Sequence, residues 1–430
     1  MPLWTPSLEW HFLPLMKHIL LFVLFFGLPL LSNAQDKPVK LKTIMGEAKA
    51  AIKNKKNEAD AEKKLLAVIN REDVTHEKRA EIYYMAMELQ RSQNEAENMK
   101  LYLKQAYDTL KFFSTIVKMH EYLLLCDSVE SAPRGVMPIK YKYRNKGREV
   151  MKVYRPNLLN GGKFLLKRNK YADAFPYFDT YLKTARHPIF EDYSSIKSDT
   201  LLPRVAYWAT LSAYNANHPE NALKYIDEAI EGADENLRVS LQEYKVRCYE
   251  VLKNDSLRMQ NLIIGTKLYP SHDYFFLHLM DDYVQQKKFE EGIALCDTML
   301  QKVGNRSIYW YGRSQVHLAN NDFDETIRTA NEALKCDSLM ADGYYNKGIA
   351  YLNKAVKFAE TACNDVRNPK CQKDRKVLMG LYREAKQPME MLRKLAPNDK
   401  ERWGMPLYRI YLNLNMGAEF AEIEQIVNAQ

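Results

Sequence analysis

The 430-residue sequence is poor in glycine and proline, with 16 and 17 residues respectively. Glycine makes up about 4% of the chain against a usual share of about 7%, which argues against collagen-like chains, flexible linkers and turn-dense all-β folds. Catalytic signatures are absent as well: the sequence contains no GxSxG, HExxH, GxGxxG or GxxxxGKS/T motif. The nine histidines are scattered without metal-ligand spacing. We therefore expect a helical protein that is not an enzyme and has no cofactor and no metal site.

Long apolar runs are also missing, with one short exception at Ile19–Leu31. As a helix this run spans about 20 Å, less than the bilayer core of about 30 Å. Lys17 precedes the run, and small residues ending at Ala34 follow it, which is the pattern of a secretory signal peptide. We predict a signal peptide at residues 1–34 and no transmembrane segment after its cleavage.

The predicted signal indicates where translation and the mature chain begin, and in which compartment the mature chain is expected. Met16 opens a better-proportioned signal than Met1, so residues 1–15 need not be translated. Cleavage after Ala34 leaves Gln35 as the first mature residue, and the mature chain is expected to be periplasmic, on the cell surface or secreted. An uncleaved N-terminal anchor is the alternative, and a lipid anchor is disfavoured because no cysteine lies near the cleavage point.

A repeat with helical spacing dominates the second half of the chain. In ADGYYNKGIAYL, Tyr344, Gly348 and Tyr351 follow one helix face, and in FDETIRTANEAL, Phe323 and Ala330 do the same. Together the two segments resemble the helix pair of a tetratricopeptide repeat (TPR), whose period is about 34 residues. Repeat starts fall at 155, 203, 239, 273, 307, 341 and 400, and the four starts from 239 to 341 are equally spaced at this period. The predicted fold is an all-α solenoid of TPR helix-turn-helix repeats.

The irregular intervals define the predicted domain organisation. The longer intervals, from 155 to 203 and from 341 to 400, place insertions near 187–199 and 354–379, which we expect to form loops at one edge of the solenoid. Residues 35–130 are an N-terminal helical region of degenerate repeats or a cap, 131–154 a basic connector, and 155–430 the TPR array. Residues 417–427 are expected to form a C-terminal capping helix. With the phrase YRPNLLNGG at 154–162, the chain is similar to secreted TPR proteins of Bacteroidetes-type bacteria.

The TPR resemblance also implies a binding groove, lined by helix-A positions 2, 5, 9, 12 and 13. Tyrosine recurs there, and tyrosine is enriched in binding surfaces because it offers a large rigid area with a hydroxyl. Packing between neighbouring repeats is the alternative for each residue. The predicted groove consists of Lys163, Lys167, Arg204, Tyr207, Tyr214, Asn215, Arg247, Tyr274, Asp281, Gln285, Tyr311, Gln315, Tyr345, Asn353, Tyr408 and Tyr411.

A basic segment from Lys140 to Lys170 stands out in a chain with a net charge of +9. It contains Lys140, Lys142, Arg144, Lys146, Arg148, Lys152, Arg155, Lys163, Lys167, Arg168 and Lys170 against the single acid Glu149. Predicted export argues against nucleic acid as a partner. The alternatives are contact with an anionic envelope surface and a solvated face. Within this segment Gly162 occupies the small position of a repeat helix, which favours close helix packing over a phosphate loop.

The six cysteines include one close pair, Cys363 and Cys371, and no CxxC motif. Both lie in the larger insertion, outside repeat core positions, and the intervening DVRNP is rich in turn residues. Because an exported chain meets an oxidising compartment, we predict a disulfide between them.

Two classes of function fit these observations. The first is an exported, non-enzymatic scaffold that binds a peptide or a helix of another envelope protein. The alternative is a glycan-capture protein of the nutrient-uptake type. That class would show clustered tryptophans, whereas Trp208, Trp310 and Trp403 fall in three different repeats.

Overall fold

The computed structural model describes residues 39–428 apart from 134, 136–138, 192, 194, 195, 197 and 364–367. The predicted signal peptide, Met16 and the cleavage point before Gln35 lie outside these residues. Within the described residues the regular structure is helical and contains no strand. The helices are α1 (Leu41–Asn54), α2 (Glu58–Ala67), α3 (His76–Tyr102), α4 (Thr109–Ser131), α5 (Arg144–Leu166), α6 (Tyr171–Arg186), the 3₁₀ turn η1 (Pro188–Phe190), α8 (Leu202–Asn215), α9 (Pro219–Leu223), α10 (Ile226–Glu231), α11 (Glu235–Val251), α12 (Asp255–Leu268), α13 (Asp273–Gln285), α14 (Phe289–Lys302), α15 (Ser307–Ala319), α16 (Phe323–Cys336), α17 (Ala341–Ala359), α18 (Pro369–Leu395), α19 (Lys400–Asn413) and α20 (Gly417–Asn428).

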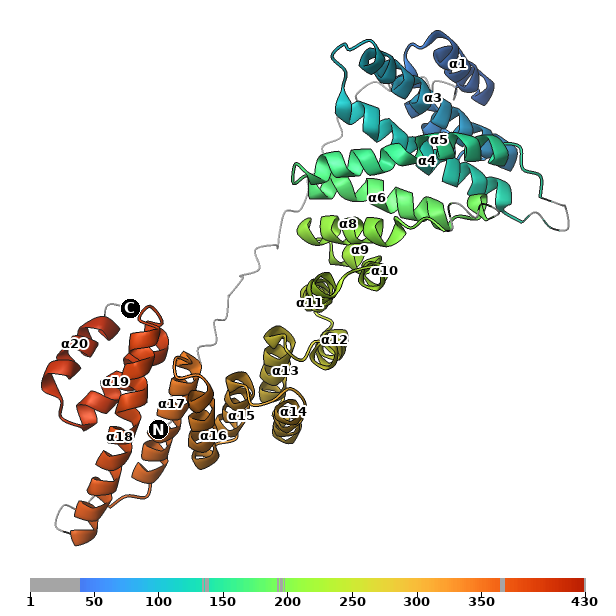
Figure 1. Cartoon of the computed structure of the whole chain (residues 1–430). Helices are drawn as coiled ribbons and strands as arrows, with labels where there is room; N and C mark the ends of the chain where they lie inside the picture. The colour runs from blue at the N-terminus through green and yellow to red at the C-terminus, as the bar shows by residue number, and fades with distance from the viewer. Residues whose placement is uncertain are drawn as a thin grey trace, which may run out of the picture.

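These helices form an extended array of antiparallel pairs (Figure 1). Helices α1–α6 gather at one end, and α8–α20 follow as successive pairs toward the C-terminus. Each helix contacts its sequence neighbours, and α13, α15 and α17 also contact one another in turn. Stacked pairs of this kind bury their apolar faces only against adjacent pairs, as in a solenoid.

The repeat period is present in the backbone as well as in the sequence. Helices α13, α15 and α17 begin at Asp273, Ser307 and Ala341, the predicted repeat starts. The turns inside successive pairs contain Lys253, Lys287 and Asn321, one repeat period apart, each in the left-handed region with φ of 54–60°. A residue in this region ends a helix by letting the next N–H reach back to an unpaired carbonyl. The predicted all-α solenoid of TPR helix-turn-helix repeats is confirmed.

Small residues allow the helices of a pair to approach closely. A Cβ added to Gly162 of α5 would lie 2.6 Å from Cε1 and 2.7 Å from Cζ of Phe178 in α6, a ring that is fully buried. The same situation occurs at Gly265, whose Cβ would lie 2.3 Å from a ring carbon of Phe275. The interpretation of Gly162 as a packing residue is therefore correct.

The predicted basic connector at 131–154 is wrong in extent, because residues 144–154 belong to the continuous helix α5. The buried carboxylate of Glu130 accepts hydrogen bonds from the backbone N–H groups of Lys142, Tyr143 and Arg144 at 2.7–3.2 Å. A carboxylate at a helix start satisfies the unpaired donors of the first turn. Only the short segment between α4 and α5 remains a connector.

The repeat start at 239 keeps the repeat register, because the turn residue Lys253 lies one period before Lys287, but the helix of this repeat begins one turn earlier. Helix α11 begins at Glu235, because Asp234 caps it by accepting a hydrogen bond from the N–H of Leu237 at 3.0 Å. In the preceding pair the second helix is broken into α9 and α10. At the break, Lys224 and Tyr225 both donate hydrogen bonds to Asp179 of α6.

The insertion at 354–379 does not form the loop that we expected. It lengthens both helices of its pair, so that α17 has 19 residues and α18 has 27. The resulting α17–α18 hairpin projects beyond the neighbouring pairs at the lower left of Figure 1. Apolar residues at helical spacing, such as Leu352 and Ala355, continue the buried face of α17 past the usual repeat length.

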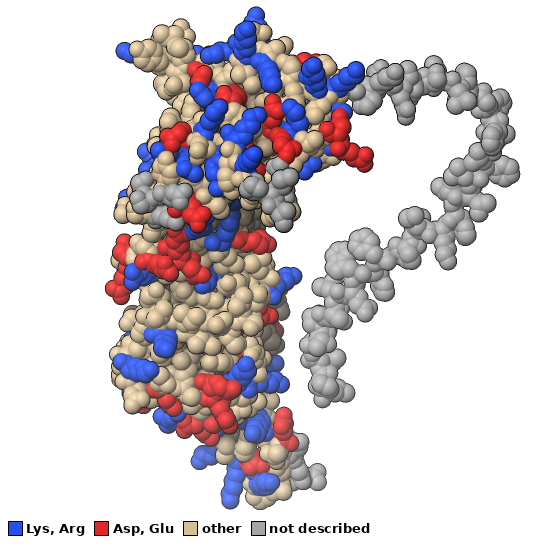
Figure 2. Space-filling view, turned by 90° about the vertical axis from the view of Figure 1, so that its right-hand side faces the viewer, with Lys and Arg blue, Asp and Glu red and all other residues tan. Residues whose placement is uncertain are grey.

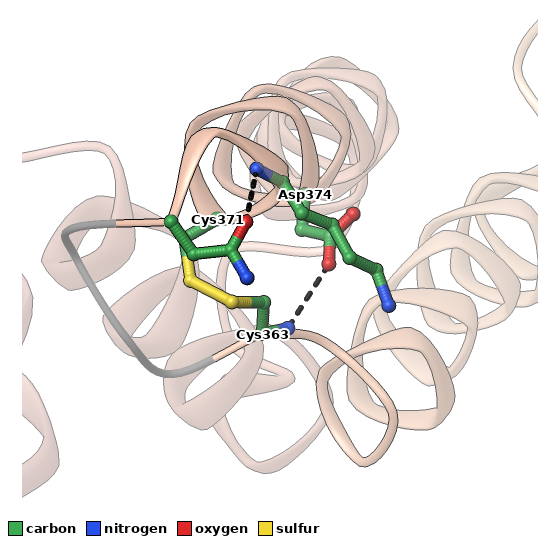
Figure 3. The surroundings of a disulfide bond; sticks show 5 residues. Cys363, Cys371 and Asp374 are labelled. Carbon is green, nitrogen blue, oxygen red and sulfur yellow. Dashed lines mark hydrogen bonds between the residues drawn. A yellow bond between two sulfur atoms is a disulfide. The ribbon is translucent and has the colours of Figure 1, made fainter.

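A disulfide joins Cys363 to Cys371 at the tip of this hairpin, with Cα atoms 4.8 Å apart (Figure 3). Asp374 accepts a hydrogen bond from the backbone N–H of Cys363 at 3.0 Å. Asn368 caps α18 by accepting one from the N–H of Lys370 at 2.9 Å. Together these contacts tie the first turn of α18 to the end of α17.

Candidate functional site on the inner face of the array

The first helices of the C-terminal pairs, α15, α17 and α19, form one face of the array. A cavity of about 470 Å³ opens on this face and is lined in part by Tyr311, Gln315 and Tyr345, three of the predicted groove residues. Asp342 and Arg402 complete its polar wall. We call it the tyrosine–arginine cavity.

The charged wall of the tyrosine–arginine cavity is fixed by ion pairs. Nη2 of Arg402 lies 2.7 Å from Oδ1 of Asp342, and the guanidinium carbon lies 4.2 Å from the ring centroid of Tyr345. Arg402 is also paired with Asp399 at 3.3 Å. A guanidinium held over an aromatic face is attracted to the ring quadrupole, which holds the Tyr345 ring in place.

Gln315 of α15 lines another part of the cavity, and its amide is held by a hydrogen bond. Nε2 of Gln315 donates to Oδ1 of Asp281 at 2.8 Å, which orients the amide. Its Oε1 is buried and has no hydrogen-bond partner in the described part of the chain. Burial, with the carboxylates of Asp342 and Asp281, raises the pKa of Tyr311 to about 12, so its hydroxyl is protonated at neutral pH. The cavity thus combines two tyrosine side chains with the ion pair of Arg402 and Asp342.

A second, apolar cavity of about 220 Å³ lies further along the same helices. It includes the predicted residue Asn353, and Val356 and Met405 at its edge are each 45% exposed. Both cavities are lined by residues of α17 and α19, and we call the surface that holds them the groove between α17 and α19. The other lining residues are Ile349, Leu352, Tyr382, Pro406 and Arg409.

Aromatic side chains form a separate cluster across α8, α11 and α13. Tyr214 stacks on Tyr244 with ring centroids 4.1 Å apart, and the guanidinium of Arg247 lies 5.3 Å from the ring of Tyr274. Tyr207 is near enough to Tyr244 to raise its pKa, to which burial contributes most. Sequence reasoning missed Tyr244 because it lies at position 6 of its repeat, outside the helix-A positions taken to line the groove.

The last predicted groove residues, Tyr408 and Tyr411, contact neighbouring helices. Tyr411 is 2% exposed and donates a hydrogen bond to Glu390 of α18 at 3.0 Å. Tyr408 packs against Phe420 of the capping helix α20, with ring centroids 4.8 Å apart. The assignment of Tyr411 to the groove is wrong, because its side chain is buried, whereas Tyr408 stays partly exposed beside the capping helix.

The remaining predicted residues do not gather into one site. Lys163 lies over the ring of Trp208, with Nζ 4.6 Å from the centroid. Asn215 donates to the carbonyl of Leu211 in its own helix at 2.8 Å. Exposed positions without a role in either cavity are Lys167, Arg204 and Gln285.

Much of the basic segment is used inside the fold. Arg144 pairs with Asp127 of α4 at 2.6 Å, and the side chain of this acid is 1% exposed. Arg155 pairs with Asp199 at 2.7 Å, and Arg148 donates to the carbonyl of Ile189 at 2.7 Å. The acids that neutralise the segment are distant in sequence, so charge counting along the chain overestimated its free positive charge.

Comparisons with known proteins add the following findings. No family model matches the chain, and no curated protein matches it either. The C-terminal part of a TPR repeat-containing protein from Cytophaga hutchinsonii is 14% identical, over 62% of this chain and 93% of that one, with a TM-score of 0.40. A TPR repeats protein from Bacteroides fragilis is 18% identical over 59% and 96%, with a TM-score of 0.31. A tetratricopeptide repeat protein from Parabacteroides merdae is 14% identical over 64% and 97%, with a TM-score of 0.33.

The helix pairing of this chain, rather than these likenesses, identifies its fold as a solenoid of TPR-type repeats. Among the described residues, no helix has the length and apolar character needed to cross a membrane. The same part of the chain contains no group of three or more histidine, cysteine or acidic side chains arranged to hold a metal ion.

Proposed function

We propose that the chain is an exported, non-enzymatic scaffold whose groove between α17 and α19 binds a peptide or a helix of another envelope protein. The observation that carries the proposal is the tyrosine–arginine cavity, which places Tyr311, Gln315 and Tyr345 around one opening. The carboxylate of Asp342 on the cavity wall has a side chain that is 48% exposed, so it can accept hydrogen bonds from the N–H groups of a ligand.

The groove fits a polypeptide because its two cavities differ in character. The tyrosine–arginine cavity offers tyrosine rings for packing, and the partly exposed carboxylate of Asp342 can accept hydrogen bonds from backbone N–H groups. The apolar cavity of about 220 Å³ suits a single apolar side chain of the same partner. Interfaces commonly combine a buried apolar contact of this kind with aromatic and arginine side chains.

The test replaces Tyr311 and Tyr345 together by alanine. The full chain is used as bait in envelope extracts, bound proteins are quantified by mass spectrometry, and thermal melts are recorded alongside. We expect captured partners to fall at least tenfold while the helix content stays unchanged. Tyr344→Ala is the matched control, because Tyr344 lies on the same helix but lines a different pocket. Unchanged capture by a folded double variant, or a loss of several kcal/mol of stability as in core truncations, would contradict the proposal.

Glycan capture is the second candidate, and the aromatic cluster around Tyr244 favours it. Tyr214 and Tyr244 stack on each other, so a sugar ring could pack only against the other face of each tyrosine ring. A glycan array probed with the wild-type chain and with Tyr274→Ala distinguishes the two candidates. Specific sugar binding that depends on Tyr274 would support the second candidate against the first.

Export is part of the proposal and rests on residues 16–34. N-terminal sequencing of the protein recovered from the cell envelope is expected to find Gln35 as the first residue. Recovery of a chain that retains residues 16–34 would contradict cleavage.

A further inference from the structure

The outer face of the α17–α18 hairpin carries an unneutralised line of positive charge. Along α18, four basic residues recur at intervals of 3, 7 and 11 positions, close to whole numbers of helical turns. They are Lys373, Lys376, Arg383 and Lys394, and all four are exposed. We call this line the basic stripe; at 1.5 Å per residue it is about 32 Å long.

The basic stripe lies opposite the face of α18 that enters the core. The buried face consists of Tyr382, Ala385, Met389 and Leu392. Among the described residues, α18 packs mainly against α17 and α19, and the four stripe residues stay exposed. Figure 2 shows lysine and arginine side chains at the lower end of the molecule, where the hairpin projects.

The positive charges of the stripe have no internal partners. Across the described residues, none of its four members takes part in an ion pair, in contrast to Lys386, which pairs with Glu390 at 3.6 Å. Glu384 is the acid nearest to Arg383 in sequence. Lys370 is also exposed, in the first turn of α18, and it contributes further positive charge at the N-terminal end of the helix.

The position of Lys370 is unfavourable for the isolated helix. The N-terminal end of a helix carries a partial positive charge, and the first turn of α18 contains no acid to offset it. Here the disulfide between Cys363 and Cys371 holds the turn in place. An anionic partner would offset both the side-chain charges and the helix dipole.

We propose that the basic stripe is a docking surface for an acidic polypeptide segment of a partner protein, separate from the groove between α17 and α19. A single line of charges along one helix matches a linear partner, such as an acidic helix or an extended acidic chain. A helix that binds a membrane surface would instead combine its basic face with a large exposed apolar face that inserts into the lipid. Apart from Val377, which is 49% exposed, the distal half of α18 offers no strongly exposed large apolar side chain.

The experiment measures binding of fluorescent poly-L-glutamate to the full-length mature chain at low and at physiological salt. The stripe variant is Lys373→Glu with Lys376→Glu and Arg383→Glu. The control variant is Lys42→Glu with Lys267→Glu and Lys302→Glu, which changes the net charge equally at three exposed lysines elsewhere that have no ion-pair partner among the described residues. Circular dichroism checks that both variants are folded. If the three glutamates unfold α18, a stripe variant with glutamine at the same three positions is used instead.

We expect the stripe variant to lose at least tenfold in affinity while the control variant stays within twofold of the wild type. The salt dependence of binding should weaken only in the stripe variant, because it has lost the charges that salt screens. An equal loss in both variants would assign binding to the overall charge of the chain and overturn the proposal. Absence of poly-L-glutamate binding at low salt, or stripe-dependent binding of phosphatidylglycerol vesicles without poly-L-glutamate binding, would also overturn it.

Discussion

Adding one methyl group at Gly162 tests whether close helix packing holds the array together. In Gly162→Ala the new Cβ would lie 2.6 and 2.7 Å from two ring carbons of Phe178, distances that real Cβ atoms do not show. The ring cannot easily move away, because it is fully buried and also packs against Trp208 at a centroid distance of 5.7 Å. One side of the α5–α6 interface must therefore shift.

Two opposing terms set the magnitude. Alanine is better than glycine inside a helix by about 1 kcal/mol. Overpacking a rigid core costs about 1–3 kcal/mol, and the overlap with a fixed ring places Gly162 at the upper end. We expect a net destabilisation of about 2 kcal/mol. Gly46→Ala is the control, because Gly46 is exposed in α1 and a Cβ there meets nothing within 4 Å, so this variant should gain about 1 kcal/mol.

Native-state hydrogen exchange is the suitable assay, since repeat arrays need not unfold in one step. The opening free energy of α5 and α6 should fall in Gly162→Ala and be partly restored when Phe178→Leu is added, because the two sites share one contact. If Gly162→Ala stabilises α5 as Gly46→Ala stabilises α1, the packing argument is refuted.

Three further predictions concern stability and redox state. Burial lowers the pKa of His120 to about 4, against about 6.5 in the unfolded chain. The stability that neutral His120 contributes is therefore complete above pH 6.5, and about 3 kcal/mol of it is lost as the pH falls to 4. His120→Gln should flatten this part of the pH–stability curve, and an unchanged curve would refute the prediction. Asp127→Ala leaves Arg144 without its partner and should cost about 3–5 kcal/mol in urea unfolding, whereas a cost under about 1 kcal/mol would show that the pair is not structural. Replacing Cys363 and Cys371 by serine should lower the local unfolding free energy by about 2–3 kcal/mol, and the change in hydrogen exchange should be confined to the hairpin tip. An alkylatable Cys363 in non-reducing peptide maps of the exported protein would disprove the bond.

The sequence predicts the regular pairs well because their turns are short and repeat one backbone conformation. Helices α13, α15, α17 and α19 begin at or next to the expected positions, and the turn residues in the left-handed region keep the repeat register. The larger insertion was located correctly from the same arithmetic. Its helical form was missed, although the apolar spacing of Leu352 and Ala355 continues the helix period into it.

The candidate site was predicted in part, for a related reason. Tyr311 and Tyr345 share a cavity because they occupy equivalent positions in adjacent, regular repeats. Tyr411 occupies a different repeat position, and it is buried where it donates a hydrogen bond to Glu390 of α18. The pairing of Arg144 and Arg155 with acids on other elements depends on the folded arrangement and leaves no local pattern in the sequence.

Site-specific photo-cross-linking tests the central claim that the groove between α17 and α19 binds a polypeptide partner. A benzophenone amino acid is placed at Tyr345 in one variant and at Ile263, which is 45% exposed on α12, in another, and intact cells that express each variant are irradiated. The account predicts discrete adducts with an envelope protein from position 345 that disappear when Tyr311 is also replaced by alanine, and no such adduct from position 263. Equal adducts from both positions, or adducts from position 263 alone, would contradict it.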